Sequence, residues 1–558
     1  MNGGNQPTTN GPRPTAHGPR PTEYGPRNTE HGPTPRGPRL LTAVTLLALS
    51  LVAVYPLFSG SLPCSDDAAF HLLRLTQLDH LLRQGVLYSR WAPDMAQGYG
   101  FPFFNFYAPL SYYFAELTSL LAGNLNLGMR LALALGIYAT GLTSYLLARD
   151  HFSKPAALVT AVAVLYAPYF AFDIYFRGNL AESLAWPLLP LALWGMGRWV
   201  RTAQPRWLLL TAVTYAAILL THNVFALIFS PLLALYGIWE IVNSQWSMVN
   251  GQRRKLTINH WLLTIGNSLL PLLLGLGFAA FFWLPAIAER GLVHSDRLLV
   301  PPIFVYWGNF VTLGEIFAAP QTVHPDLINP SPARALGLVP LLLALPALTL
   351  GWWRLRPEPR RQMIFFALAT AVYVFLMTAV SDPLWANLPL IEYVQFPWRL
   401  LGPAALTLAM LVGASVDALA GDKVTVTPSP HPLVTLSALL FITALILTDL
   451  AWLDARFCPG LENPTIADMQ AFERDSATIG TTAKGEYLPR TVEYMPDQPA
   501  IEPFAPLPDP AVLQSATRAP LRLEAAIRAS APFTLTANIF DYPGWQAKVD
   551  GRSVPITP

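Results

Sequence analysis

The chain has 558 residues, of which 53% are hydrophobic and only 13% are charged. Soluble domains carry about 25% charged residues, so this composition excludes an ordinary soluble protein and predicts a polytopic membrane protein. The formal net charge of +2 does not indicate a nucleic-acid-binding protein, and two cysteines are too few for a disulfide framework or a cysteine metal cluster.

Residues 1–39 form the first predicted region. Three seven-residue units repeat there, each with a Gly-Pro pair and almost no apolar side chain: Asn10–Ala16, His17–Glu23 and Tyr24–Glu30. A segment of this composition cannot bury enough apolar surface to form a core. We therefore predict a disordered cytoplasmic tail, which is too long and too polar for the start of a signal peptide.

Apolar runs long enough to cross a bilayer, which takes roughly 20 residues, follow the tail. The predicted spans are 40–59, 128–148, 155–172, 181–199, 207–221, 224–241, 261–283, 334–351, 362–380, 399–418 and 433–452. We therefore predict an all-α polytopic membrane domain of about 11 transmembrane helices over residues 40–452.

A further apolar run, 103–121, is ambiguous, and the distribution of Lys and Arg decides its interpretation. If this run does not cross, the basic tail and most of the basic loops lie on the cytoplasmic side. If it crosses, every later basic loop moves outside. We therefore predict that 103–121 is a re-entrant or interfacial helix within a large outer loop, residues 60–127.

Residues 453–558 are predicted to be a Pro-rich and β-rich module on the outer face. Phe533–Phe540 alternates apolar and polar side chains, which predicts a strand. Tyr542–Trp545 reads as a turn, and Gln546–Gly551 reads as a strand that enters a hairpin turn.

The outer loop opens with the segment Cys64-Ser-Asp-Asp-Ala-Ala-Phe-His71. A carboxylate within hydrogen-bond reach can take the proton of an attacking hydroxyl. Asp67 and His71 are spaced i, i+4 and share a face if the segment is helical, so we favour Asp67 over Asp66. The alternative is that both acids are solvated or cap a helix, since Ser-Asp-Asp before an apolar run is a good capping signal.

This outer loop, with its acidic pair and interfacial helix, resembles the GT-C superfamily of integral-membrane glycosyltransferases. Four segments also resemble the bacterial membrane proteins called 6-pyruvoyl-tetrahydropterin synthase-related: Asp67–His71, Gly98–Pro102, Phe106–Leu110 and Arg177–Glu182. No pterin chemistry is expected from that label. Tyr542–Gly551 resembles the outer β module of related large bacterial membrane proteins.

The resemblance implies an inverting hexosyl or pentosyl transferase in the bacterial cytoplasmic membrane. Its donor would be a polyprenyl-phosphate sugar, and its acceptor an envelope polymer or lipid on the outer face. In the superfamily the acidic residue of the first outer loop acts as general base or helps to hold a divalent metal, which makes Asp66 and Asp67 candidates for a Mg²⁺ or Mn²⁺ site.

Further candidates come from charged and polar residues at the predicted outer ends of the spans. Asp94 is a possible second catalytic carboxylate, or a turn aspartate after proline. Arg177 with Glu182, His222 and Arg399 are candidates for binding the lipid phosphate, together with His71. The alternatives are a structural His71, an interface arginine paired with Glu182, a buried polar cap at His222 and an interface arginine at Arg399.

Two hypotheses remain open beside these residues. Cys64 and Cys458 both follow a span on the predicted outer side, so we expect a disulfide between them. The alternative to an enzyme is a non-catalytic scaffold or transporter for envelope assembly. The spans are nearly free of charged residues and show no inverted repeat, which disfavours a transporter but not a scaffold.

Overall fold

The computed structural model describes residues 1, 3–4, 36–248, 258–321, 334–421, 432–453, 455–457, 462–482 and 484–558. It divides into two units, Met1–Val44 and Thr45–Pro558. Most of the predicted disordered tail, 1–39, lies outside the described residues, so that prediction stays untested.

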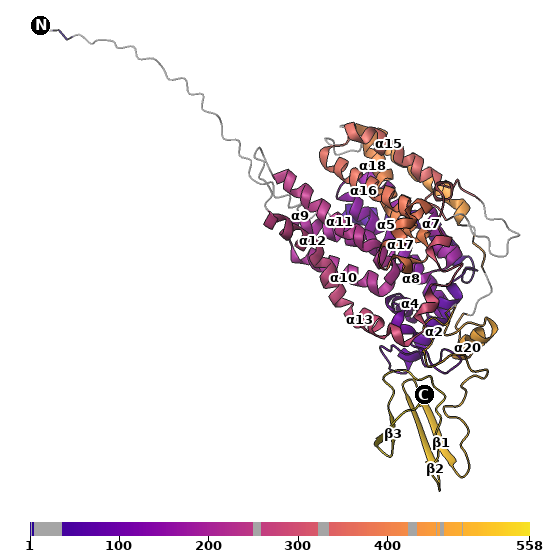
Figure 1. Cartoon of the computed structure of the whole chain (residues 1–558). Helices are drawn as coiled ribbons and strands as arrows, with labels where there is room; N and C mark the ends of the chain where they lie inside the picture. The colour runs from indigo at the N-terminus through magenta and orange to yellow at the C-terminus, as the bar shows by residue number, and fades with distance from the viewer. Residues whose placement is uncertain are drawn as a thin grey trace. The chain divides into compact units, whose positions relative to one another are not determined.

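Most of the second unit is helical (Figure 1). The longer helices are α1 (Arg36–Val54), α5 (Leu125–Arg149), α6 (Lys154–Leu165), α9 (Leu188–Thr202), α10 (Pro205–Thr221), α11 (Asn223–Met248), α12 (Ile258–Phe278), α13 (Ala280–Glu289), α15 (Leu338–Arg354), α16 (Pro357–Met377), α18 (Leu401–Ala420) and α19 (Pro432–Asp449). The shorter helices are α2 (Ala68–Arg83), α3 (Phe103–Phe106), α4 (Leu110–Ala122), α7 (Pro168–Phe172), the π-helical turn η2 (Asp173–Arg177), α8 (Leu180–Ala185), α14 (Leu313–Ile316), α17 (Asp382–Asn387) and α20 (Ile466–Asp475). Short 3₁₀ turns complete the set: η1 (Tyr55–Phe58), η3 (Arg290–Leu292), η4 (Ser295–Leu298), η5 (Tyr306–Gly308), η6 (Ala379–Ser381), η7 (Ile391–Val394), η8 (Pro397–Leu400) and η10 (Leu450–Trp452).

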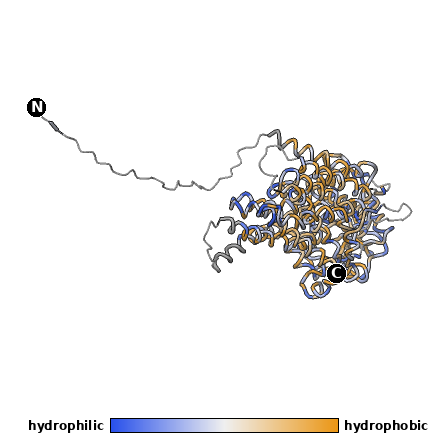
Figure 2. Tube along the Cα trace, turned by 90° about the horizontal axis from the view of Figure 1, so that it is seen from above, coloured by the Kyte–Doolittle hydropathy of each residue, from blue (hydrophilic) through white to orange (hydrophobic). Residues whose placement is uncertain are grey.

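Among the described residues, 7 helices are long and apolar enough to cross a membrane, or up to 8 if a bent pair is counted as one span. Hydrophobic residues dominate along these helices (Figure 2). Two shorter apolar helices, α10 and α15, coincide with the predicted spans 207–221 and 334–351. The protein is therefore a multi-pass membrane protein, while the predicted count of about 11 helices is not confirmed.

Two of the predicted spans are broken in the structure. Residues 181–199 form α8 and α9, with a break at Trp186 and Pro187, because proline lacks the N–H that a continuous helix needs. The region predicted to span at 261–283 contains a bend of 71° between Gly266–Phe278 and Ala280–Leu292. Apolar composition alone did not reveal either break.

The run 103–121 contains α3 and α4 and is not among the spans of sufficient length. α4 exposes Phe114, Leu117, Leu120 and Leu121, while its other face packs against α2 and α5. An exposed apolar face on a short helix suits a segment that lies in the membrane interface. The interfacial position itself stays a prediction.

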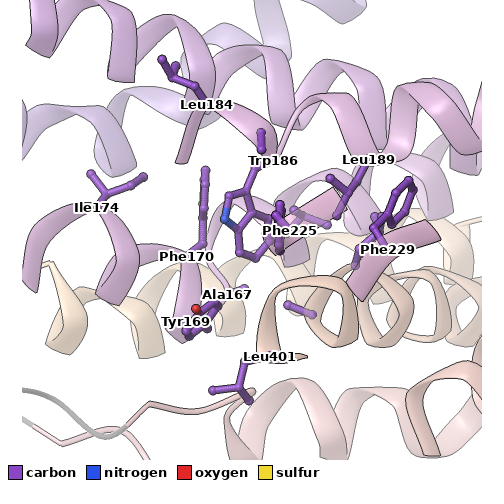
Figure 3. Packing of buried hydrophobic residues seen from close by; sticks show 14 of the residues in the cluster. Ala167, Tyr169, Phe170, Ile174, Leu184, Trp186, Leu189, Phe225, Phe229 and Leu401 are labelled. Carbon is purple, nitrogen blue, oxygen red and sulfur yellow. The ribbon is translucent and has the colours of Figure 1, made fainter. Parts of the chain in front are cut away.

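The centre of the second unit is formed by the chain segments Lys154–Arg177 and Pro397–Ala420, each 94% buried over its apolar window. Large aromatic side chains fill the space around them. Figure 3 shows Phe170, Trp186 and Phe225 close together, with ring centroids 4.6 Å apart for Phe170 and Trp186. This packing fixes the chain just before and after η2, where the candidate site lies.

The C-terminal region contains two separate antiparallel hairpins. The first joins β1 (Val512–Ala519) to β2 (Arg522–Arg528), and the second joins β3 (Ala547–Val549) to β4 (Arg552–Val554). The turn of the second is Asp550 and Gly551, both at positive φ, as its sequence predicts. The first hairpin was not predicted, because most of its residues on both faces are exposed and no apolar alternation marks it.

The strand predicted at Phe533–Phe540 is wrong. Only Ala537 forms a bridge there, with Phe504. The neighbouring segment contains Pro503, Pro506 and Pro508, and prolines cannot donate to a strand ladder. Alternation of side chains therefore predicted a strand for which no continuous partner exists.

The first long loop and the C-terminal region lie on the same side of the helices. Pro63 forms a backbone bridge with Phe457, the Cys64 N–H donates to the Arg456 carbonyl at 2.8 Å, and α20 packs against α2. We call this side, which carries residues 60–124, 455–457, 462–482 and 484–545, the loop side. Its assignment to the outer face of a bacterial membrane stays a prediction.

The predicted Cys64–Cys458 disulfide concerns a residue, Cys458, outside the described part of the chain. The contacts of Pro63 and Cys64 with residues 456–457 bring the backbone next to that position. We expect the wild type to migrate faster on a denaturing gel without reductant than with it, and Cys458→Ser to migrate equally under both conditions. Equal migration of the wild type would contradict the bond.

Candidate functional site

Asp67 stands immediately before α2, but it does not cap that helix through its side chain. The Oγ of Ser65 accepts the N–H of Ala68 at 3.3 Å instead. The His71 N–H donates to the Asp67 carbonyl at 3.0 Å, so the i, i+4 spacing is helical as predicted. The Asp67 carboxylate, 37% exposed, therefore remains available for other partners.

Those partners come from the end of η2 and the segment that follows it. The Asn179 amide donates to Asp67 Oδ2 at 3.3 Å, and Arg177 Nε lies 3.8 Å from the same oxygen. The Asp67 N–H also donates to the Arg177 carbonyl at 2.8 Å. Residues 110 positions apart in the chain are thus fixed to each other by both backbone and side chains.

Gly178 permits this close approach. Its φ is +68°, and a Cβ at this position would lie 2.1 Å from the Ser65 Oγ and 2.9 Å from the Ala68 Cβ. Only glycine adopts this left-handed conformation at no steric cost. The sequence Arg177-Gly-Asn is therefore the feature that lets the end of one central span touch the start of α2.

Arg177 is the centre of a buried ion-pair cluster. The π-helical turn places Asp173 and Arg177 together, with Arg177 Nη1 2.9 Å from Asp173 Oδ1 and 2.5 Å from Glu182 Oε2. Both acids are 0% exposed. Ser183 donates to Asp173 and Tyr169 donates to Glu182. Burial of these charges is tolerable because each carboxylate is paired and hydrogen-bonded.

His222 lies beside this cluster, with Nε2 3.9 Å from Glu182 Oε2. Its Nδ1 accepts the N–H of Phe225 at 2.9 Å, so it caps the start of α11, as one of the alternatives proposed. Burial lowers the pKa of His222 to about 3, outweighing the charge of Glu182. The ring is therefore neutral at physiological pH.

Two further arginines border the cluster around Trp398. The guanidinium carbon of Arg334 lies 4.7 Å from the Trp398 ring centroid, and that of Arg177 lies 5.4 Å from it. Arg399 stacks on Phe396 at 4.8 Å and donates to the Val394 carbonyl at 2.8 Å. Cations stack favourably on aromatic faces, so these rings hold the arginines in place.

Arg334 was not predicted as a site residue. It precedes α15 at the edge of a long loop, where a single arginine has no motif around it. It is partly buried, and among the described residues it has no ion pair within 4 Å. Arg177 is neutralised by three acids, so the charge of Arg334 is more available than that of Arg177.

His71 faces a buried polar and aromatic group on α2 and α4. Its Nδ1 lies 2.8 Å from the Tyr112 hydroxyl, which also accepts an N–H of Arg74. Arg74 donates to the Thr481 carbonyl at 2.6 Å and joins α2 to the C-terminal region. Burial, together with the charges of Arg74 and Arg177, lowers the pKa of His71 well below its usual value.

Asp94 is not brought together with these residues. Its carboxylate accepts the Gln77 amide at 2.9 Å and lies 3.8 Å from His80 Nε2. Gln77 is ten residues along α2 from Asp67, which corresponds to about 15 Å of helix. Asp94 and Asp67 therefore cannot act on the same reacting atom, and the position of Asp94 suits its alternative, a structural loop aspartate.

Asp66, by contrast, lies at the edge of the cluster. Its pKa is raised by desolvation and by the adjacent Asp67 carboxylate, against the opposing charges of Arg177 and Arg334. Two neighbouring carboxylates favour a shared proton or a cation. At this edge the geometry offers a proton acceptor, Asp67, next to cations that can hold an anionic leaving group.

The predicted divalent cation has limited support from the residues themselves. No set of three His, Cys, Asp or Glu side chains within the described ranges is arranged to hold a metal. Asp66 and Asp67 are hard oxygen ligands of the kind that Mg²⁺ and Mn²⁺ accept along with waters, while Arg177 and Arg334 already supply positive charge. A metal at these acids stays a prediction.

Comparison with known proteins gives a match over part of the chain. Residues 107–252 match the family described as dolichyl-phosphate-mannose-protein mannosyltransferase. An uncharacterized protein of Lactococcus lactis subsp. cremoris (strain MG1363) is 23% identical over 250 residues, which are 44% of this chain and 39% of that protein. The matched region contains Arg177, Glu182 and His222, but not Asp67 or Arg334.

Three solved structures are similar at low identity. ArnT from Cupriavidus metallidurans bound to undecaprenyl phosphate has a TM-score of 0.44 and 15% identity, covering 79% of each chain. The arabinofuranosyltransferase AftD from Mycobacteria has a TM-score of 0.47 and 17% identity over 74% of this chain and 26% of its own. The oligosaccharyltransferase AglB from Archaeoglobus fulgidus has a TM-score of 0.43 and 12% identity over 82% and 62%.

Proposed function

We propose that this chain is a membrane glycosyltransferase that moves a sugar from a polyprenyl-phosphate donor to an envelope acceptor on the loop side of the membrane. The observation that carries the proposal is the contact between Asp67 and the Arg177 segment, with Arg334 stacked on the same tryptophan as Arg177. The partial match to a family named for lipid-linked mannose transfer supports the same reaction class.

The proposed reaction uses Asp67 as the general base. An acceptor hydroxyl gives its proton to the Asp67 carboxylate as its oxygen attacks the anomeric carbon. The bond between that carbon and the phosphate oxygen of the donor breaks, and the polyprenyl phosphate leaves with the electron pair. Attack from the side opposite the leaving group inverts the anomeric centre.

The leaving phosphate needs positive charge that is not already neutralised. Arg334 meets this requirement: it has no ion pair within 4 Å among the described residues, and it shares the Trp398 ring with Arg177, which is itself paired with three acids. A guanidinium binds phosphate oxygens through two parallel N–H groups. Arg177 then has a different role: it fixes Asp67 at the reacting centre.

A non-catalytic scaffold would not need this arrangement. In that case the acids and cations named from the sequence could be dispersed, whereas Asp67, Arg177, Glu182 and His222 are in successive contact. This convergence supports the enzyme over the scaffold.

The direct test replaces Asp67 with Asn, which keeps the size and removes the base. We expect loss of transfer by about 100-fold or more, with normal insertion. Asp94→Asn is the matched control, since it removes a carboxylate of the same loop about 15 Å away and should leave transfer near the wild-type level. The measurement is mass spectrometry of envelope glycans from cells that lack the gene and carry each variant.

Equal restoration of the glycan by Asp67→Asn and the wild type would remove Asp67 from the chemistry. Equal loss in both variants would indicate a folding defect of the loop instead. Thermal unfolding of the purified variants separates the two, because a purely catalytic loss leaves the unfolding midpoint unchanged.

A further inference from the structure

The turn between α9 and α10 lies at the far end of these helices from the candidate site. α10 begins at Pro205 and ends at Thr221, next to His222. The sixteen residues from Arg206 to His222 correspond to about 24 Å of helix. A ligand bound near Arg206 therefore lies apart from the site at Asp67.

An aromatic and basic group occupies this turn. Trp194 on α9 and Trp207 on α10 pack edge to face, with centroids 4.9 Å apart. The guanidinium of Arg198 lies 5.7 Å from each ring, and that of Arg206 lies 5.2 Å from Trp207. Tryptophan with arginine is the pairing that membrane proteins favour at the level of the lipid headgroups.

The two arginines differ in their partners. Arg198 Nε donates to Asp150 at 2.6 Å, so its charge is paired. Arg206 is exposed and has no ion pair within 4 Å in the part of the chain that the structure describes. Arg206 therefore presents an available positive charge beside an aromatic surface.

The face of α10 below Arg206 is apolar and exposed. Leu209 and Val213 are 55% and 50% exposed, and they follow Arg206 by three and seven residues, which places all three on one face of the helix. In a membrane, acyl chains cover such side chains. Arg206 then stands at the end of a lipid-covered stripe, at the level where the phosphate of the same lipid lies.

We propose that Arg206, beside Trp207, binds the phosphate of an anionic phospholipid whose acyl chains lie on Leu209 and Val213. A guanidinium binds a phosphate through two N–H groups. A zwitterionic lipid carries its own cation next to that phosphate, whereas the glycerol headgroup of phosphatidylglycerol does not. This site is independent of the proposed transfer reaction.

The test measures lipid affinity of the full chain in detergent by native mass spectrometry. Phosphatidylglycerol and phosphatidylcholine with identical chains are titrated separately. We expect phosphatidylglycerol to bind about fivefold more tightly to the wild type, the equivalent of about 1 kcal/mol for one arginine near an anionic surface. Arg206→Gln should bind the two lipids equally, and Arg206→Lys should keep part of the preference.

The control is Arg552→Gln, which removes the same charge from the exposed β4 strand and should keep the wild-type preference. Absence of a preference in the wild type, or a preference that survives Arg206→Gln, would overturn the proposal. Displacement of the bound lipid by inorganic phosphate at constant ionic strength would show a simple anion site and would also overturn it.

Discussion

Replacing Arg177 with Met is expected to prevent recovery of folded protein, or to lower its unfolding midpoint more than any other single change in the site. Asp173 and Glu182 are 0% exposed, and Arg177 is hydrogen-bonded to both. Removing one partner of a buried ion pair costs about 3–5 kcal/mol, because it leaves an unpaired buried charge. Here a single substitution leaves two carboxylates unpaired.

This prediction distinguishes the effect of breaking a buried ion pair from that of breaking an exposed one. Arg490→Gln is the matched control: its ion pair with Asp296 is 3.0 Å long, but its two side chains are 51% and 63% exposed. Exposed pairs contribute about 0–1 kcal/mol, so that variant should unfold near the wild-type midpoint. The measurement is thermal unfolding in lipid nanodiscs.

A triple variant tests whether the unpaired buried charges cause the loss of stability. Adding Asp173→Asn and Glu182→Gln to Arg177→Met removes the unpaired charges and should recover much of the stability, while transfer stays lost because Asp67 no longer has its partner. If the single Arg177→Met variant were as stable as the wild type, the cluster would not be the buried charge network that the contacts indicate.

The second large effect is expected at Glu473, which joins α20 to the first loop. Its carboxylate is 0% exposed and accepts the N–H groups of Ala96 at 3.1 Å and Gln97 at 2.7 Å. The backbone N–H groups of Gly480 and Thr481 also favour its ionised form. These four residues have positive φ, between 53° and 58°, so two short left-handed turns lie beside one carboxylate.

Glu473→Ala should therefore destabilise the loop side strongly. Each buried N–H left without an acceptor costs about 1–3 kcal/mol, and the left-handed residues lose the interaction that holds their strained backbone. We expect limited proteolysis to release the C-terminal region of the variant. Glu502→Ala, which changes an exposed glutamate of the same region, should remain resistant; equal cleavage of both variants would contradict the prediction.

The pH dependence of folding stability tests the same contact of Glu473 independently. Burial raises the pKa of Glu473 to about 7 even though four N–H groups oppose the shift. A raised folded-state pKa means that this group contributes its full stability below the unfolded value of about 4.3 and loses it as the pH rises through 7. The wild type should thus be more stable at pH 5 than at pH 8 by a margin that Glu473→Gln reduces.

The local character of the site could be inferred before the fold was known. Asp67 and His71 share a helical face as their spacing predicts, and Arg177 with Glu182 pair as one of the alternatives stated. Asp67 and His71 are four residues apart, so helix geometry decides that they share a face. Arg177 and Glu182 are five residues apart across the turn at Gly178, so their contact is also local in the chain. His222 as a polar cap follows from similarly local chemistry.

Contacts between segments that are distant in the chain could not be predicted from local sequence patterns. Neither Arg334 nor Glu473 lies in a local sequence motif. Arg334 joins the site because Trp398 lies beside it. Glu473 is important because the turns at residues 96–97 and 480–481 lie beside its carboxylate. The strand predicted at 533–540 was wrong for the same reason: a strand needs a partner segment, and the neighbouring segment here contains prolines. The same limit applies to Asp94, whose distance from Asp67 is set by the length of α2.

Composition and apolar runs determined that this is a multi-pass membrane protein, because the bilayer selects segments by length and hydropathy whatever surrounds them. Only the tertiary structure decided which charged residues meet, since a buried ion pair depends on two segments arriving at one point. It also decided where helices break, because a span can bend when neighbouring helices compensate for the backbone groups it leaves unpaired.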